Sequence, residues 1–393
     1  MATVFPIVLR FKLFFALLLA AIGVFYSYLA LYLRTAGLSG SKIGVILGMM
    51  PLISCLVQPL WGLVGDIYQL RRSALAVACF GVGAAAWLYN TSNDFVWLVG
   101  LTFVLSVMNG PIGPLGDALS LEYLEHQGRR DNYGSLRLWG ALGFALSSFL
   151  IGALVVETAI RWIIPIYSTM MFMLGLLVLT LPDVSPPRAV AWWEGLALLK
   201  RTPQLAKFLI SVLLIGATLG VADQYLIVYL ADIHASGWVE GVVFALAALL
   251  EALLMGLAAG LIARWGLRQV LIAGIALLPL RWLLYTIISD PILVIPIQML
   301  HSIGMLSLLV AGVLYVDRQL SREWRATGQA LYQATLHGAG SSIGLFGAGV
   351  IYQYGGITPV WWTATFVGLA GLLLLIWATR LPALNRVEEG ARL

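Results

Sequence analysis

Long apolar runs alternate with short polar segments along the whole chain. A helix that crosses a membrane needs about 20 apolar residues, and twelve runs approach or exceed that length. The pattern therefore predicts an all-α polytopic membrane protein with twelve transmembrane helices. The predicted spans are residues 9–33, 42–65, 73–90, 95–121, 136–156, 161–181, 207–231, 239–263, 269–288, 291–316, 326–353 and 357–379.

Basic residues gather in the polar segments on one side of the predicted membrane. If both termini lie on the same side, 19 of the 23 lysines and arginines fall there. Short cytoplasmic loops carry such an excess, so we expect cytoplasmic termini and a plasma or bacterial inner membrane location. The exceptions are Arg34, Lys42 and Arg161 on the opposite side, and Arg281 within a span.

Composition supports a membrane protein and narrows its chemistry. Apolar residues make up 61% of the chain and charged residues only 10%, well below the roughly 25% charged residues of soluble domains. The net charge of +5 is spread over loops and tails, which indicates topology rather than nucleic-acid binding. No metal-ligand spacing, phosphate loop or nucleophile motif is visible, so we expect a non-enzyme without metal or cofactor. Cys55 and Cys79 lie in apolar spans and are expected to be free thiols.

The chain shows signs of internal duplication. The segment Gly260 to Leu271 repeats the basic turn that ends near Arg72, and RLWG at Arg137 to Gly140 resembles RATG at Arg325 to Gly328. Transporters are often built from such repeats around a central site. We therefore predict a six-helix half at 1–181, a cytoplasmic linker at 182–206 and a second six-helix half at 207–393.

Several charged or polar residues fall inside the predicted spans. Such residues are costly in a bilayer and usually face a partner or a water-filled cavity. We expect Asp117 and Arg137 to face each other across a cavity, although Arg137 could also lie at the membrane interface. Glu251 and Arg281 could instead form a purely structural ion pair. The mid-span residues are Asp223, Glu251, Arg281, His301 and His337.

Several short motifs follow one another along the chain. The segment VQPLWGLVGD ends the second span and leads through two arginines into the third, and YGSLRLWGALGFAL, ADQY, LHSIG and RATGQALY follow in order. These motifs resemble those of the major facilitator superfamily. Within the superfamily the chain is similar to lactose permease and the oligosaccharide and nucleoside proton symporters. The resemblance implies two pseudo-symmetric six-helix halves, and a gating loop formed by Gly62, Asp66, Arg71 and Arg72.

The resemblance also implies roles for intramembrane residues. Arg137 matches an arginine that hydrogen-bonds a galactoside, Phe144 occupies the place of a stacking tryptophan, and Asp117 resembles a carboxylate on the fourth helix. Arg281 and His301 match an arginine and a histidine of the ninth and tenth helices, and Glu251 lies about one turn from a family glutamate.

The chain departs from this family at the proton route. Gly304 replaces a protonated glutamate, Asp223 is expected to face Gln298 instead of a lysine, and Gly220 with His337 replaces a second pair. Galactoside specificity therefore does not carry over. In a low-dielectric cavity, the ionised form of an aspartate without a cationic partner is disfavoured. Asp223 or Glu251 could therefore carry the proton, with Arg281 and His301 setting the proton affinity.

We therefore expect a proton-coupled symporter that moves a sugar or nucleoside by alternating access, functioning as a monomer. The alternatives are a carrier of aromatic or other organic acids, an uncoupled facilitator, and an efflux pump. The expected substrate-binding residues are Asp117, Arg137, Phe144, Glu251, Arg281 and His301. The expected proton-coupling residues are Asp223, Glu251 and His301.

Overall fold

The computed structural model describes residues 6–68, 71–127, 133–182, 202–321 and 324–380, but not the side chains of residues 62–68 and 157. No strand occurs in these ranges. Eleven helical stretches are long and apolar enough to cross a membrane. A twelfth runs through α16, η6 and α17. The prediction of a twelve-helix, all-α membrane protein is confirmed.

The first six spans form one cluster, called here the N-terminal group. Its elements are α1 (Ile7–Phe25), α2 (Leu29–Thr35), α3 (Gly40–Tyr68), α4 (Arg71–Tyr89), α5 (Phe95–Asn109), α6 (Ile112–His126), α7 (Tyr133–Ile151), η2 (Gly152–Val156), α8 (Glu157–Ala159), η3 (Ile160–Trp162) and α9 (Ile163–Val178).

The last six spans form the C-terminal group. Its elements are α11 (Pro203–Asp232), α12 (Gly237–Trp265), α13 (Leu267–Ile287), α14 (Pro291–Leu306), η4 (Ser307–Gly312), α15 (Val313–Gln319), α16 (Arg325–Gln333), η6 (Ala334–Gly340), α17 (Ser341–Gly355) and α18 (Ile357–Ala378). Gly266 and Gly356 form the tight turns of this group with φ of +84° and +73°, a conformation that glycine adopts without a steric penalty.

Most span boundaries agree with the sequence prediction to within a few residues, but several spans are interrupted. The first span breaks between Phe25 and Leu29, and the fourth between Asn109 and Ile112. Pro111 explains the second break, because proline lacks the N–H that would continue the helical ladder. The segments η2, η4 and η6 are π-helical, a form that is frequent at functional sites.

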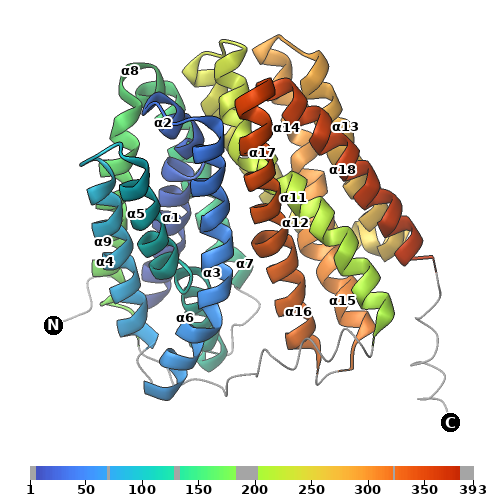
Figure 1. Cartoon of the computed structure of the whole chain (residues 1–393). Helices are drawn as coiled ribbons and strands as arrows, with labels where there is room; N and C mark the ends of the chain where they lie inside the picture. The colour runs from blue at the N-terminus through green and yellow to red at the C-terminus, as the bar shows by residue number, and fades with distance from the viewer. Residues whose placement is uncertain (1–5, 69–70, 128–132, 183–201, 322–323, 381–393) are drawn as a thin grey trace.

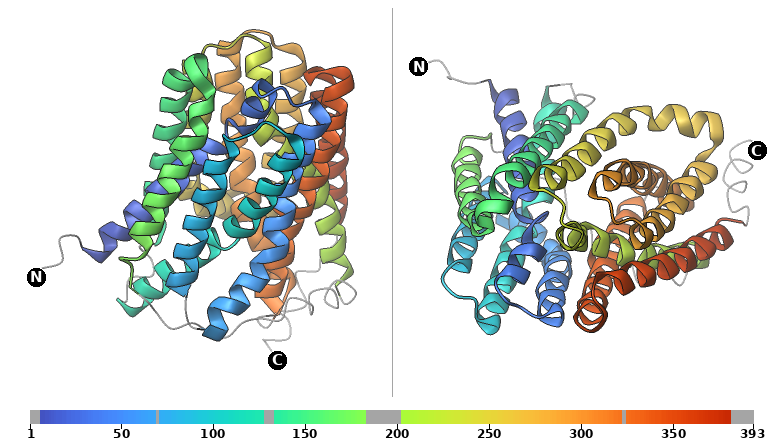
Figure 2. Two further views of the ribbon diagram at one scale, coloured as in Figure 1. Left: turned by 60° about the vertical axis from the view of Figure 1, so that its left-hand side comes forward. Right: turned by 90° about the horizontal axis from the view of Figure 1, so that it is seen from above.

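The two groups stand side by side, with α1 beginning and α18 ending at the same end of the bundle (Figure 1). We call this the termini end and the other the opposite end. Seen along the bundle axis, the blue and green helices gather apart from the yellow and red ones (Figure 2). The exact halves 1–181 and 207–393 stay a prediction, and most of the linker 182–206 lies outside the described residues.

Glycines let the two groups touch at the opposite end. A Cβ atom added to Gly44 of α3 would lie 2.7 Å from the Cα of Gly349 in α17. A Cβ atom on Gly152 of η2 would lie 2.6 Å from the Cα of Gly241 in α12. Small residues permit such approaches between membrane helices. The backbones of the two groups are therefore in direct contact here.

Polar contacts join the groups at the same end. Arg34 Nη1 lies 2.6 Å from Asp232 Oδ1, which links α2 to the end of α11. The backbone N–H of Ser41 donates to Gln353 Oε1 at 3.0 Å. At the termini end, by contrast, the ion pairs Arg71–Glu122 and Arg325–Asp317 each join helices of one group. The structure is therefore closed at the opposite end.

We predict that a side chain at Gly349 opens this seal. In Gly349→Leu the new side chain cannot fit against Gly44, so a cysteine introduced at Ser41 should react several times faster with a membrane-impermeant maleimide. Gly347→Leu is the matched control, because nothing lies within 4 Å of a Cβ atom at Gly347 on the same helix. Equal labelling rates in the two variants would contradict the glycine seal.

Candidate functional site

Asp117 and Arg137 meet in the N-terminal group, on α6 and α7. Arg137 Nη1 lies 3.4 Å from Asp117 Oδ1, so the predicted facing of these residues is observed. Tyr133 OH donates to the same carboxylate oxygen at 2.7 Å. Phe15 of α1 flanks the pair, with its ring centroid 5.9 Å from the guanidinium carbon. The side chains of Asp117 and Arg137 remain 36% and 51% exposed, so both can reach a solute.

Arg281 and His301 form the corresponding polar centre of the C-terminal group, on α13 and α14. Arg281 is completely buried, and its Nη1 lies 2.7 Å from His301 Nδ1. Arginine can only donate, so His301 Nδ1 accepts and carries no proton in this arrangement. The Nε and Nη2 atoms of Arg281 have no hydrogen-bond partner in the part of the chain that the structure describes. The alternative of a Glu251–Arg281 ion pair is wrong for this structure, since Arg281 has no carboxylate within 4 Å in the described residues.

Asp223 and Glu251 connect these two centres. Asp223 on α11 interacts electrostatically with Arg281. Glu251 on α12 interacts with Asp223 of its own group and with Arg137 of the other group. These electrostatic interactions define a series of five charged side chains, Asp117, Arg137, Glu251, Asp223 and Arg281, of which only Asp117 and Arg137 form an ion pair with each other in the described residues.

The exposure of these residues indicates the space they face. Asp223 is exposed, although 72% of the most apolar stretch of its helix α11 is buried inside the protein. His337, on η6, is likewise exposed in mid-span. Because a charged residue this far along a span is favoured only beside a partner or water, we infer that Asp223 and His337 face a water-accessible space between the two groups.

Gln298, Gly304 and Gly220 occupy positions where the sequence departs from the resemblance described above. No hydrogen bond joins Gln298 to Asp223 in the part of the chain that the structure describes, and Gln298 Oε1 accepts from Tyr285 OH at 2.7 Å. Gly304 packs so tightly that a Cβ atom there would lie 2.5 Å from Leu278 Cδ2, so a glutamate would need the leucine to move. Gly220 packs in the same way against Ser341.

Phe144 is the remaining predicted substrate-binding residue. Phe144 is half-buried on α7, about two helical turns from Arg137, and its stacking role stays a prediction.

The four residues of the predicted gating loop are only partly described. Gly62 and Asp66 lie where the side chains are not described. Arg71 pairs with Glu122 at 2.6 Å, and Arg72 donates to the carbonyl of Leu181 at 3.2 Å. The two arginines therefore tie helices together within the N-terminal group.

Two features of the site escaped the sequence analysis. The hydroxyl of Tyr133 was not singled out, although its spacing of four residues from Arg137 places both side chains on one face of a helix. The Arg281–His301 contact could not be distinguished from a pairing with Glu251 by sequence alone. The free state of Cys55 and Cys79 is confirmed, and in the described residues no cluster of three potential ligands could hold a metal ion.

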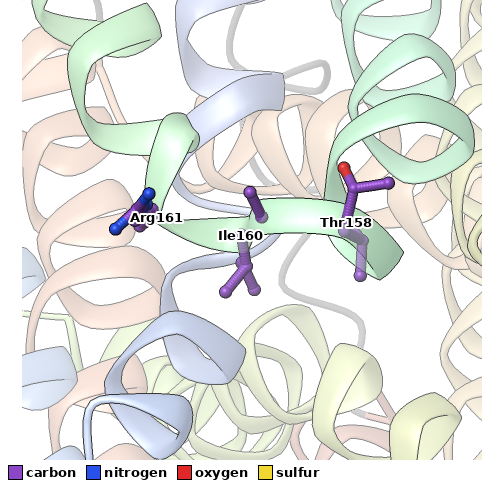
Figure 3. A pocket seen from close by; sticks show the side chains of 5 residues that line it. Thr158, Ile160 and Arg161 are labelled. Atoms are coloured by element: carbon purple, nitrogen blue, oxygen red, sulfur yellow. The ribbon is translucent and has the colours of Figure 1, made fainter.

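A separate pocket of about 380 Å³ lies at the opposite end, where η2 leads into α9. Thr158 and Arg161 extend to different sides of it, with Ile160 between them (Figure 3). Val156 and Ala159 complete the lining. None of the charged residues between the groups lines this pocket, so it is not part of the candidate site.

Comparisons with known proteins place the chain among transporters. The model of the MFS_1 like family matches residues 8–363. The maltose permease of Geobacillus stearothermophilus is 30% identical over 384 residues, covering 93% of both chains. The probable 3-phenylpropionic acid transporter of Escherichia coli is 28% identical, covering 90% of this chain and 93% of its own.

A solved structure supports the same fold. The nucleoside transporter NupG superposes with a TM-score of 0.85 at 17% sequence identity. The match covers 96% of this chain and all of the solved chain. At this identity the likeness establishes the fold alone.

We predict that His301 stabilises the buried Arg281. His301→Leu should lower the free energy of unfolding by about 3 kcal/mol, because a buried charge that loses its partner is strongly destabilising. His301→Gln keeps an acceptor and should lose much less. Thermal unfolding in detergent measures both, and the double variant Arg281→Met with His301→Leu should recover stability because the buried charge is gone. Identical melting of the Leu and Gln variants would refute this.

Proposed function

Because this chain belongs to the MFS_1 like family and is a transporter of the major facilitator type rather than an enzyme, we propose that it carries a sugar or nucleoside together with a proton. Transport proceeds by alternating access between the two groups of helices. The observation that carries the proposal is the series of charged side chains from Asp117 to Arg281, which crosses from one group to the other.

The solute binds between Arg137 and Glu251. A guanidinium and a carboxylate each engage two hydroxyl groups of a polyol or ribose. Phe144, on the same helix as Arg137, offers an aromatic face for the less polar side of a ring. The printed name of one relative, a maltose permease, supports a sugar as the solute.

The proton resides on the carboxylates of the C-terminal group. The series contains three carboxylates (Asp117, Asp223 and Glu251) and two guanidiniums (Arg137 and Arg281), so one carboxylate lacks a cation of its own. Glu251 interacts electrostatically with a like charge, Asp223, and two like charges disfavour the ionisation of both carboxylates at once. His301 is less suited as the carrier, because its Nδ1 is occupied by Arg281.

We infer the coupling from this arrangement of charges. With Glu251 or Asp223 protonated, the solute occupies the space between the groups and the charges of the site are balanced. Release of the solute and proton at the termini end leaves Glu251 to pair with Arg137, which permits the return. We place the termini end in the cytoplasm, from the distribution of basic residues, and expect a monomer.

The test uses proteoliposomes with an imposed pH gradient and radiolabelled maltose or uridine. One pH unit supports at most about tenfold accumulation per proton, since 1.4 kcal/mol corresponds to a factor of ten. Asp223→Asn or Glu251→Gln should abolish accumulation while solute exchange at equal pH continues. Glu125→Gln is the control, because Glu125 is exposed at the end of α6. Full pH-driven accumulation in both site variants would exclude this proton site.

A carboxylate-bearing solute is the second candidate. The Nε and Nη2 atoms of completely buried Arg281 have no partner among the described residues, and a carboxylate accepts from two guanidinium nitrogens at once. The printed name of one relative, a probable 3-phenylpropionic acid transporter, favours the same class. The excess of carboxylates over guanidiniums in the site argues against an anion, which is why it stands second.

Thermal unfolding in the presence of maltose, uridine or 3-phenylpropionate separates the two candidates. A ligand at 100 times its Kd stabilises the folded state by about 2.7 kcal/mol. We expect stabilisation by maltose or uridine that is lost in Arg137→Ala. Stabilisation by 3-phenylpropionate alone, lost in Arg281→Met but kept in Arg137→Ala, would replace the sugar or nucleoside with an acid.

A further inference from the structure

Tyr133 is the nearest hydrogen-bond donor to the Asp117 carboxylate among the described side chains. Its hydroxyl donates to Asp117 Oδ1 at 2.7 Å, whereas Arg137 Nη1 reaches the same oxygen only at 3.4 Å. The shorter contact comes from a neutral phenol and the longer one from a charged guanidinium. This is the reverse of the usual order, because charge-assisted hydrogen bonds between arginine and carboxylate are normally the short ones and are frequently bidentate.

The surrounding packing fixes the tyrosine in this position. Tyr133 is the first residue of α7, half-buried, and its ring meets Phe15 of α1 edge to face at 6.1 Å. The same phenylalanine ring lies beneath the Arg137 guanidinium. Tyr133 and Arg137 are four residues apart on one helix, so both approach Asp117 from the same face of α7.

We propose that Tyr133 is a positioning residue that keeps the Asp117–Arg137 pair loose. By competing with Arg137 for Oδ1, the tyrosine hydroxyl weakens the hold of Asp117 on the guanidinium, whose single contact of 3.4 Å leaves its remaining N–H groups available to the solute and to Glu251. Without the hydroxyl, Arg137 closes onto Asp117 and is withheld from the space between the groups. This inference rests on the proposed role of Asp117 and Arg137 in binding the solute.

The alternative is that the Tyr133–Asp117 hydrogen bond is purely structural and only connects the start of α7 to α6. Loss of a structural contact would affect folding and expression, and would lower the number of active molecules without changing the affinity of those that remain for the solute. A positioning role predicts a different result, because the affinity for the solute falls while the maximal rate of correctly folded molecules is retained.

The test compares Tyr133→Phe with the parent in proteoliposomes, using whichever of maltose and uridine the parent carries. We expect the KM of Tyr133→Phe to rise about tenfold with less than a twofold change in Vmax per folded molecule. In the Asp117→Asn background the same substitution should have no further effect on KM. Tyr123→Phe is the matched control, because Tyr123 on α6 packs its ring against Phe11 and its hydroxyl forms no hydrogen bond in the described residues.

A second readout needs no solute. In a double-mutant cycle of melting temperature, the shifts of Tyr133→Phe and Asp117→Asn should be strongly non-additive, as expected of two hydrogen-bonded residues. An unchanged KM, or additive effects in either cycle, would overturn the proposal. A parent protein that carries neither probe would contradict the proposed function instead, and the melting cycle would then decide the Tyr133–Asp117 contact by itself.

Discussion

The cost of a charge inside an apolar helical bundle governs this structure. Each such residue must have a partner or reach water, since a charged side chain at the centre of a bilayer costs about 2.5–3.5 kcal/mol on insertion scales. The chain meets this requirement by arranging five charged residues in one series between the two groups of helices. Arg281 lies at the buried end of the series, with His301 as its hydrogen-bond partner. Asp117 and Arg137 lie at the exposed end.

The same constraint links the site to the movement of the groups. Arg137 belongs to one group and Glu251 to the other, so their attraction depends on how the groups are placed. At the opposite end, glycine contacts and the Arg34–Asp232 ion pair hold the groups together. A solute that inserts between Arg137 and Glu251 therefore changes the interaction between the groups as well as the charge balance of the site, and this connects binding to alternating access.

The sequence predicted the spans and most of the charged residues, because apolar runs and isolated charges are local signals. It did not predict the break at Tyr26 to Tyr28 or the π-helical segments, which depend on packing against neighbouring helices. It also could not choose a partner for Arg281. His301 and Glu251 were both close to mid-span, and only the arrangement of α12, α13 and α14 decides that the histidine is in contact. Tyr133 was missed because an aromatic residue near a helix end usually has an interfacial role.

A crystal or cryo-EM structure of the protein with its solute bound would test this mechanism most directly. We expect density for the solute between the two groups, in contact with Arg137 of α7 and Glu251 of α12 at once. The solute should lie within hydrogen-bond distance of these two residues while the opposite end stays sealed at Gly44 and Gly349. A solute held by one group alone, or bound in the pocket lined by Thr158 and Arg161, would rule out this mechanism.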